Sequence, residues 1–134
     1  MTSSIEHIKA GNLLIAILVP GSYSPSATEF LTPSELNMQL GFIKYPEGSS
    51  ITPHVHTPIE RNTIGTNEVL IVQSGKIELS LYDEAHVLIA QRILNQGDFV
   101  LLIGGGHGIQ ILEDAVLLEV KQGPYSGLED KSRF

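Results

Sequence analysis

Short apolar runs separated by glycine and proline are the feature that most constrains how this chain can fold. The 134 residues include 13 glycines and 7 prolines, which are spread along the whole sequence. The runs between them are rich in valine, isoleucine and leucine, and none keeps a helical apolar spacing over three turns. In the clearest run, residues 76–82, apolar residues at 77, 79 and 81 alternate with polar ones. An alternation of period two is typical of a half-buried β-strand.

The glycines and prolines between the apolar runs predict about nine short strands with turns between them. The expected strands are residues 13–19, 36–45, 51–57, 68–72, 76–82, 86–94, 99–103, 107–112 and 115–122. Ser74-Gly75 is expected to form a hairpin turn between two of them. Such a series predicts an all-β sandwich or barrel in a single domain of residues 1–134. The barrel core would cover about residues 12–122, with the segment up to Gly11 and the tail from Gly123 flanking it.

Composition excludes several classes of function. Fifteen acidic residues against eight lysines and arginines give a net charge of −7, which disfavours nucleic-acid binding. No cluster of basic residues suits a membrane surface, and the apolar run near the start is far shorter than the ~20 residues of a membrane-spanning helix. The chain has no cysteine, so disulfides and thiolate chemistry are absent. We expect a cytoplasmic protein.

Three histidines have a spacing that suits a metal site. His54 and His56 are two residues apart on an expected strand, so their imidazoles would point to the same face. His107 follows three glycines, which would turn the backbone and aim its side chain inward. Glu68 opens the strand that a hairpin arrangement would pair with the His54 strand. Three imidazoles and one carboxylate suit Fe, Mn, Ni, Co or Zn as divalent ions.

Simpler interpretations of the same residues have to be weighed. A His-x-His pair on an amphipathic strand is usually a surface pair, and His7 and His86 have no metal-site context. Glu60 and Arg61 could form a local ion pair, which would contribute only ~0–1 kcal/mol when exposed. The glycine run 104–106 lacks the Lys-Ser/Thr and the following helix of a phosphate-binding loop.

The histidine pattern resembles the metal-binding motifs of the cupin superfamily. The first motif of that family is a glycine, five residues, His-x-His, three or four residues, a glutamate, six residues and a glycine. Here Gly48 precedes His54 by this spacing, and Glu68 precedes Gly75 by this spacing. The loop 57–67 is longer than the usual spacer. The second motif is degenerate: Gly97 opens it, Ile103 stands where proline is expected, and His107 comes one residue early.

The resemblance implies a small single-domain cupin, an antiparallel β-barrel of the jelly-roll type with a divalent metal inside. It carries the family ligands over to His54, His56, Glu68 and His107. Glu60 is the competing carboxylate, because its distance from His56 matches the family. We favour Glu68, because its spacing to Gly75 runs along one strand, whereas the spacing from His56 crosses a loop that tolerates insertion.

Two functions follow from the resemblance. The first is a metal-dependent enzyme, of isomerase, lyase or dioxygenase type, acting on a sugar or a small keto or hydroxy acid. Tyr45, Glu60 and Arg61 would be its catalytic candidates, with Arg61 holding an anionic substrate. The second is a non-catalytic module that binds or senses a small ligand. Similar proteins are commonly homodimers through strand exchange or sheet packing, and a partner's sheet could cover the apolar run 12–19.

Overall fold

The structure is a computed structural model that describes residues 4–134, with the backbone alone for residues 128 and 129. The described chain divides into two compact units, which we treat separately. Residues 4–23 and 66–134 form the first, which we call the sheet unit. Residues 24–65 form the second, which we call the extended segment.

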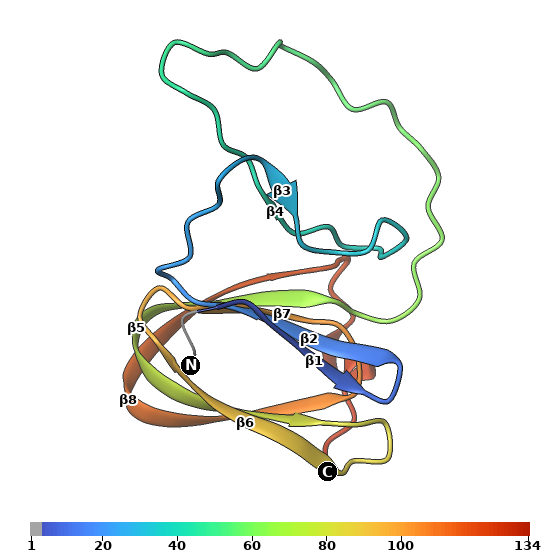
Figure 1. Ribbon diagram of the computed structural model, residues 1–134. Helices are drawn as coiled ribbons and strands as arrows, with labels where there is room; N and C mark the ends of the chain where they lie inside the picture. Colours follow the sequence, from blue (N-terminus) through green and yellow to red (C-terminus); the bar gives the residue numbers. More distant parts are fainter. Residues whose placement is uncertain (1–3) are drawn as a thin grey trace. The chain divides into compact units, whose positions relative to one another are not determined.

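One antiparallel sheet forms the sheet unit (Figure 1). Its order is β1-β2-β7-β5-β6, and β8 pairs with the opposite edge of β5. The sheet is strongly curled into a half-barrel. The all-β prediction is therefore confirmed. The strands are β1 (Glu6–Ala10), β2 (Leu13–Val19), β5 (Glu68–Tyr82), β6 (Leu88–Asn95), β7 (Phe99–Leu102) and β8 (Gly106–Lys121).

A bulge at Gly75 stands where the sequence predicted a hairpin turn. The expected strands 68–72 and 76–82 are one continuous strand, β5, and the register with β8 shifts on both sides of Ser74. Gly75 has a φ of +86°, and a Cβ there would overlap the Asp114 carbonyl oxygen. Only glycine combines this backbone conformation with so close a neighbour. The hairpin prediction is wrong because the left-handed residue bends the strand without reversing it.

The same bulge determines which residues of β5 face the core. Before it, the even-numbered residues Leu70 and Val72 face the core, and after it the odd-numbered Ile77, Leu79 and Leu81 do. Side chains alternate across a strand, so one extra residue moves the apolar set to the other parity. Both halves of β5 thereby present apolar side chains to one face of the curled sheet. Residues of β2, β6 and β7 complete this core: Ile15, Ala16, Leu18, Leu94, Val100 and Leu102.

The N-terminal segment belongs to the sheet, contrary to the sequence-based prediction that it flanks the barrel. β1 pairs with β2, and Ile8 and Ala10 pack against the core. The apolar residues of β1 alternate with charged or polar ones, so this short strand was not recognised in the sequence. Because β2 lies between β1 and β7 and residues 15–19 are fully buried, the apolar run 12–19 needs no partner's sheet.

The extended segment contains little regular structure. Two-residue strands β3 (Glu29–Phe30) and β4 (Gly41–Phe42) pair with each other, and the Thr28 side chain exchanges hydrogen bonds with the Lys44 backbone beside them. The strand predicted at 36–45 is reduced to β4, and the one predicted at 51–57 is not formed. Pro46, Pro53 and Pro58 donate no backbone hydrogen bond, which weakens any ladder there.

The C-terminal tail leaves β8 and ends beside the β5–β6 turn. A short 3-10 helix spans Gly127–Asp130. The terminal ring of Phe134 stacks on His86 at a centroid distance of 4.1 Å and meets Tyr82 edge-on at 5.0 Å. The part of the chain that the structure describes contains no helix that is long and apolar enough to cross a membrane.

Candidate functional site

A carboxylate and an imidazole meet within the sheet unit. His107 Nε2 lies 2.9 Å from Glu68 Oε1, so a protonated Nε2 donates a hydrogen bond to the carboxylate. The Glu68 side chain is 13% exposed and the His107 side chain 36%. Both residues were predicted site residues, and they are 39 positions apart in the sequence. The fold therefore brings this pair together.

The curl of the β5–β8 ribbon explains the contact. Glu68 is the first residue of β5, opposite Lys121 on β8, whereas His107 is opposite Leu81 near the other end of β5. Glu68 continues the alternation that leads to Leu70 and so faces the core side. His107 lies on the same side, because directly opposed residues share a face and Leu81 is buried in the core. The bend at Gly75 folds the two ends toward each other.

The glycines before His107 make the tight turn that the sequence predicted. Gly105 has a φ of +61°, and a Cβ there would overlap the Tyr82 carbonyl oxygen. The backbone N–H groups of Ile103 and Gly104 both donate to the Ile15 carbonyl, at 2.9 and 3.2 Å. The start of β8 is thus fixed against β2 and β5, which aims His107 at the core side.

Glu68 is held in its charged form. The hydrogen bond from His107 lowers its pKa to about 2, against the opposing effect of burial. A hydrogen bond with Glu119 and the nearby charges of His107 and Lys121 lower it further. Glu68 therefore presents an ionised carboxylate over the whole range in which proteins normally work.

Glu119 and Lys121 are members of this cluster that the sequence reasoning missed. Glu119 is directly opposite Leu70, on the core side of the ribbon, and its carboxyl group hydrogen-bonds to Glu68. That hydrogen bond, followed by burial and repulsion from Glu68, raises the pKa of Glu119. Lys121 is opposite Glu68 and lies 3.9 Å from Asp130. A single glutamate among the apolar residues 115–118 and 120 was the available signal.

His54 and His56 lie in the extended segment, outside its two short strands. Both are exposed, and their rings are neighbours with a centroid distance of 5.3 Å. His54 Nδ1 is 2.8 Å from the Thr52 carbonyl oxygen. The strand expected to carry them is absent, and Glu68 pairs with β7 and β8 instead of with such a strand. The prediction that the two histidines are metal ligands stays a prediction.

The catalytic candidates also belong to the extended segment. Tyr45, Glu60 and Arg61 are exposed, and no ion pair joins Glu60 to Arg61 in the described chain. His7 and His86 are exposed. His86 has a φ of +66° in the turn after Asp83, so its position reflects turn geometry.

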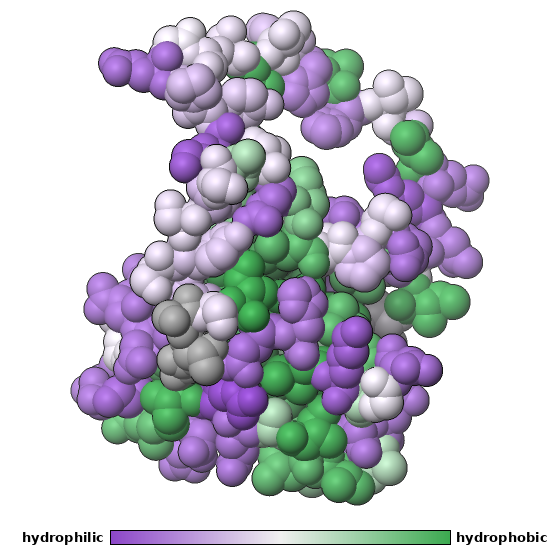
Figure 2. Space-filling view, in the orientation of Figure 1, coloured by the Kyte–Doolittle hydropathy of each residue, from purple (hydrophilic) through white to green (hydrophobic). Residues whose placement is uncertain are grey.

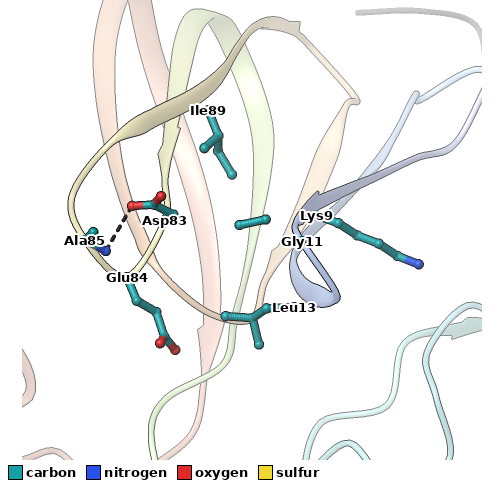
Figure 3. A pocket seen from close by; sticks show the side chains of 8 residues that line it. Lys9, Gly11, Leu13, Asp83, Glu84, Ala85 and Ile89 are labelled. Carbon is teal, nitrogen blue, oxygen red and sulfur yellow. Dashed lines mark hydrogen bonds between the residues drawn. The ribbon is translucent and has the colours of Figure 1, made fainter.

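A shallow hollow of about 690 Å³ lies elsewhere in the sheet unit, wide open to solvent (Figure 3). It is bordered by the β1–β2 turn and the β5–β6 turn. Lys9, Asp83 and Glu84 are its charged lining residues. Asp83 already accepts hydrogen bonds from the backbone N–H groups of Ala85 and Val87, both at 2.9 Å, so it serves the β5–β6 turn. The lining residues of the hollow are Lys9, Ala10, Gly11, Leu13, Asp83, Glu84, Ala85 and Ile89.

Among the side chains that the structure describes, no three of histidine, aspartate or glutamate are arranged to hold a metal ion. Glu68 and His107 supply two donors of the right chemistry, one oxygen and one nitrogen. Comparison with family models, with curated proteins and with solved structures found no match to this chain.

Proposed function

We propose that the protein binds a divalent metal ion at Glu68 and His107 and acts on a small polar metabolite there. The observation that carries this proposal is their 2.9 Å contact on the core side of the half-barrel. A carboxylate oxygen and an imidazole nitrogen are ligands that Zn, Ni, Fe and Mn share. The cupin-type jelly roll, with His54 and His56 as further ligands, belongs to the same proposal.

The chemistry of the donors fits such an ion. Glu68 is ionised without any metal, so it has no proton to lose on binding one. A metal ion would take the place of the proton between His107 Nε2 and Glu68 Oε1, which lie 2.9 Å apart. When bound, a metal would act as a Lewis acid toward a coordinated oxygen.

The charges around the pair indicate the class of ligand. Lys121 faces Glu68 across the ribbon and offers an ammonium group beside the site. Glu119 adds a carboxyl group that can accept or donate a hydrogen bond. An ammonium group would attract the carboxylate of a small keto or hydroxy acid, and a carboxyl group would orient a hydroxyl. Sugars and small acids are therefore the proposed ligands, and the cytoplasm is the proposed compartment.

One observation favours the alternative, a module that binds or senses a ligand without turnover. Tyr45, Glu60 and Arg61 form no ion pair or side-chain hydrogen bond within the described residues. Catalytic groups are normally held in position by such contacts. Assay of turnover on a panel of keto acids, hydroxy acids and sugars separates the two functions, because the binding module would bind without converting any of them.

Metal titration tests the proposal itself. Protein purified without chelator should contain about one equivalent of metal by elemental analysis, or take it up on titration with Ni²⁺ or Zn²⁺. Glu68→Gln and His107→Ala should each weaken binding by about tenfold or more. The matched control is His86→Ala, which removes an exposed histidine of the same unit. Equal affinity in all three variants, or a wild-type protein that refuses metal, would overturn the proposal.

A further inference from the structure

The C-terminal tail contacts both ends of the curled β5–β8 ribbon. After β8 the tail forms the 3-10 helix Gly127–Asp130 and continues to Phe134. Figure 1 shows it running from the end of β8 down one side of the half-barrel. One of its contacts lies at the end of the ribbon that carries Glu68, and the other lies at the end that carries His107.

The first contact is made by Asp130, beside Glu68. The Thr66 hydroxyl donates a hydrogen bond to the Asp130 carboxylate, and Thr66 is two residues before Glu68 in the chain. Lys121 is directly opposite Glu68 on β8, and its Nζ lies 3.9 Å from the same Asp130 carboxylate. Asp130 is therefore held next to the start of β5.

The second contact is made by Phe134, beside His107. The Phe134 ring stacks on His86 and meets Tyr82 edge-on. Gly106, which precedes His107, makes room for this ring, because a Cβ there would lie only 2.8 Å from Phe134 Cζ. Tyr82 is directly opposite Gly106 on β5. We call the space between Tyr82, His86 and Gly106 the ring slot, and it holds Phe134 next to the start of β8.

The backbone of His86 indicates that its imidazole has a use in the ring slot. His86 has a φ of +66°, a left-handed conformation that glycine adopts freely and that other residues adopt at a cost. The turn nevertheless carries an imidazole at this position. Stacking between His86 and Phe134 offsets part of the conformational cost.

The lengths of chain involved show what the two contacts do. Asp130 and Phe134 are four residues apart, so the chain between them spans at most about 14 Å. Gly106 and Lys121 are fifteen residues apart on β8, which would separate them by about 50 Å in a straight strand. The tail reaches both of them only because the ribbon is curled. While both contacts hold, the ribbon cannot straighten.

Between its two contacts the tail is loosely held. Lys131, Ser132 and Arg133 are exposed, and none of them has a hydrogen bond or ion pair within the described residues. Figure 2 shows that hydrophilic side chains are frequent on the side of the sheet unit where the tail runs. The Phe134 ring is itself 63% exposed. The ring slot can therefore lose Phe134 without unfolding of the sheet.

We propose that residues 130–134 form a clasp that holds the two ends of the curled ribbon together, and that Phe134 is thereby a positioning residue for the Glu68–His107 contact. The clasp and that contact link the same two ends. Each link brings the ends together for the other, so the two links stabilise each other. Release of Phe134 from the ring slot lets the ends move apart and separates His107 from Glu68. Only the use of this pair as metal donors rests on the proposed function.

Chemical labelling of the histidines in EDTA tests the clasp without metal. Diethyl pyrocarbonate modifies imidazole nitrogens, and peptide mass spectrometry gives the rate for each histidine. His107 should react slowly in the wild-type protein, because Glu68 is hydrogen-bonded to its Nε2. Glu68→Ala gives the rate of the unpaired imidazole. Phe134→Ala should raise the His107 rate by about threefold or more, whereas His7 on β1 should keep its rate.

Gly106→Ala empties the ring slot without changing the tail. The added Cβ would occupy the space of the Phe134 ring, and Gly106 has no positive φ, so its backbone accepts alanine. This variant should raise the His107 rate as much as Phe134→Ala does, and the double variant should raise it no further. Gly108→Ala is the matched control on the other side of His107, because a Cβ there meets only Tyr82, at 4.0 Å.

Three outcomes would overturn the clasp. A faster His86 with an unchanged His107 in Phe134→Ala would show that the ring leaves the slot while the pair stays intact. Unchanged rates at both histidines would show that the slot does not hold the ring. An equal rise at His7 in both slot variants would indicate general unfolding. A failed metal titration beside the expected labelling rates would overturn the metal proposal alone.

Discussion

The sheet unit and the extended segment both contain apolar side chains, and they bury them very differently. Leu79 in the sheet unit is fully buried, whereas Val55 in the extended segment is 89% exposed. Leu79 has strands on both sides of it, since β5 pairs with β6 and β8. Val55 has no strand beside it in the described chain. The difference teaches that apolar patterning makes a strand only where a neighbouring edge accepts it.

Truncation of a core side chain should give the largest difference between the two units. Leu79→Ala removes apolar contacts from a fully buried site and should lower the free energy of unfolding by about 2–5 kcal/mol. Ile59→Ala, at a site 64% exposed in the extended segment, should change it by less than about 0.5 kcal/mol. Urea unfolding measures both. Comparable losses in the two variants would mean that the extended segment has a core of its own.

Two glycines with similar backbone conformations allow a finer comparison. Gly75→Ala should lower the free energy of unfolding by about 2–4 kcal/mol, because a Cβ would meet the Asp114 carbonyl in a left-handed conformation. Gly48→Ala carries the conformational cost alone, about 1 kcal/mol, since no atom lies near its Cβ position. Thermal and urea unfolding provide the values. Equal losses would show that the bulge does not set the bend of β5.

Lowering the pH should reduce the stability that the ionised Glu68 carboxylate contributes to the folded state. A carboxylate with a lowered pKa stabilises the folded state above its unfolded pKa of ~4.3, and this contribution is lost as the pH falls toward 2. The wild-type protein should therefore lose about 1–3 kcal/mol more than Glu68→Gln between pH 5 and pH 2. Urea unfolding across this range measures the difference. Parallel curves for the two proteins would contradict the lowered pKa.

The contribution of Glu119 to stability should change with pH in the opposite direction to that of Glu68. Its raised pKa means that its charged form is disfavoured in the folded state, so its contribution falls as the pH rises through the folded pKa. Glu119→Gln keeps a hydrogen-bond donor for Glu68 without the second charge. The variant should be at least as stable as the wild-type protein at pH 7, by thermal unfolding. A clear loss of stability at pH 7 would show that the Glu119 charge is favourable there.

Much of the sheet unit could be predicted from the sequence, because its signals are local. The strand expected at 13–19 is β2 (Leu13–Val19), and the turn at Asp83 was also expected. Gly75 was misassigned because a left-handed glycine suits a bulge as well as a hairpin turn. The strand predictions for the extended segment failed for a physical reason. Its short apolar runs predict strands, but the partner that would pair with them cannot be deduced from local patterning.

Two residues of the cluster, Glu68 and His107, were singled out from the sequence, but their contact was not. The motif spacing from His56 favoured Glu60, whereas the spacing to Gly75 favoured Glu68, which is the first residue of β5. Its contact with His107 depends on the curl of the β5–β8 ribbon, whose register shifts three times between Val72 and Ile77, and no spacing rule expresses this curl. Glu119 escaped notice because it belongs to no motif. Its place in the cluster follows from its position opposite Leu70.

A double-mutant cycle between Glu68 and His107 tests the central claim most directly, since the whole account depends on the ribbon bringing these side chains together. Glu68→Gln, His107→Gln and the double variant are compared with the wild-type protein by urea unfolding at pH 6, without metal. We predict a coupling energy of about 1 kcal/mol or more, because the pair is a charge-assisted contact with limited exposure. Additive effects of the two substitutions would contradict the contact, and with it the proposed site.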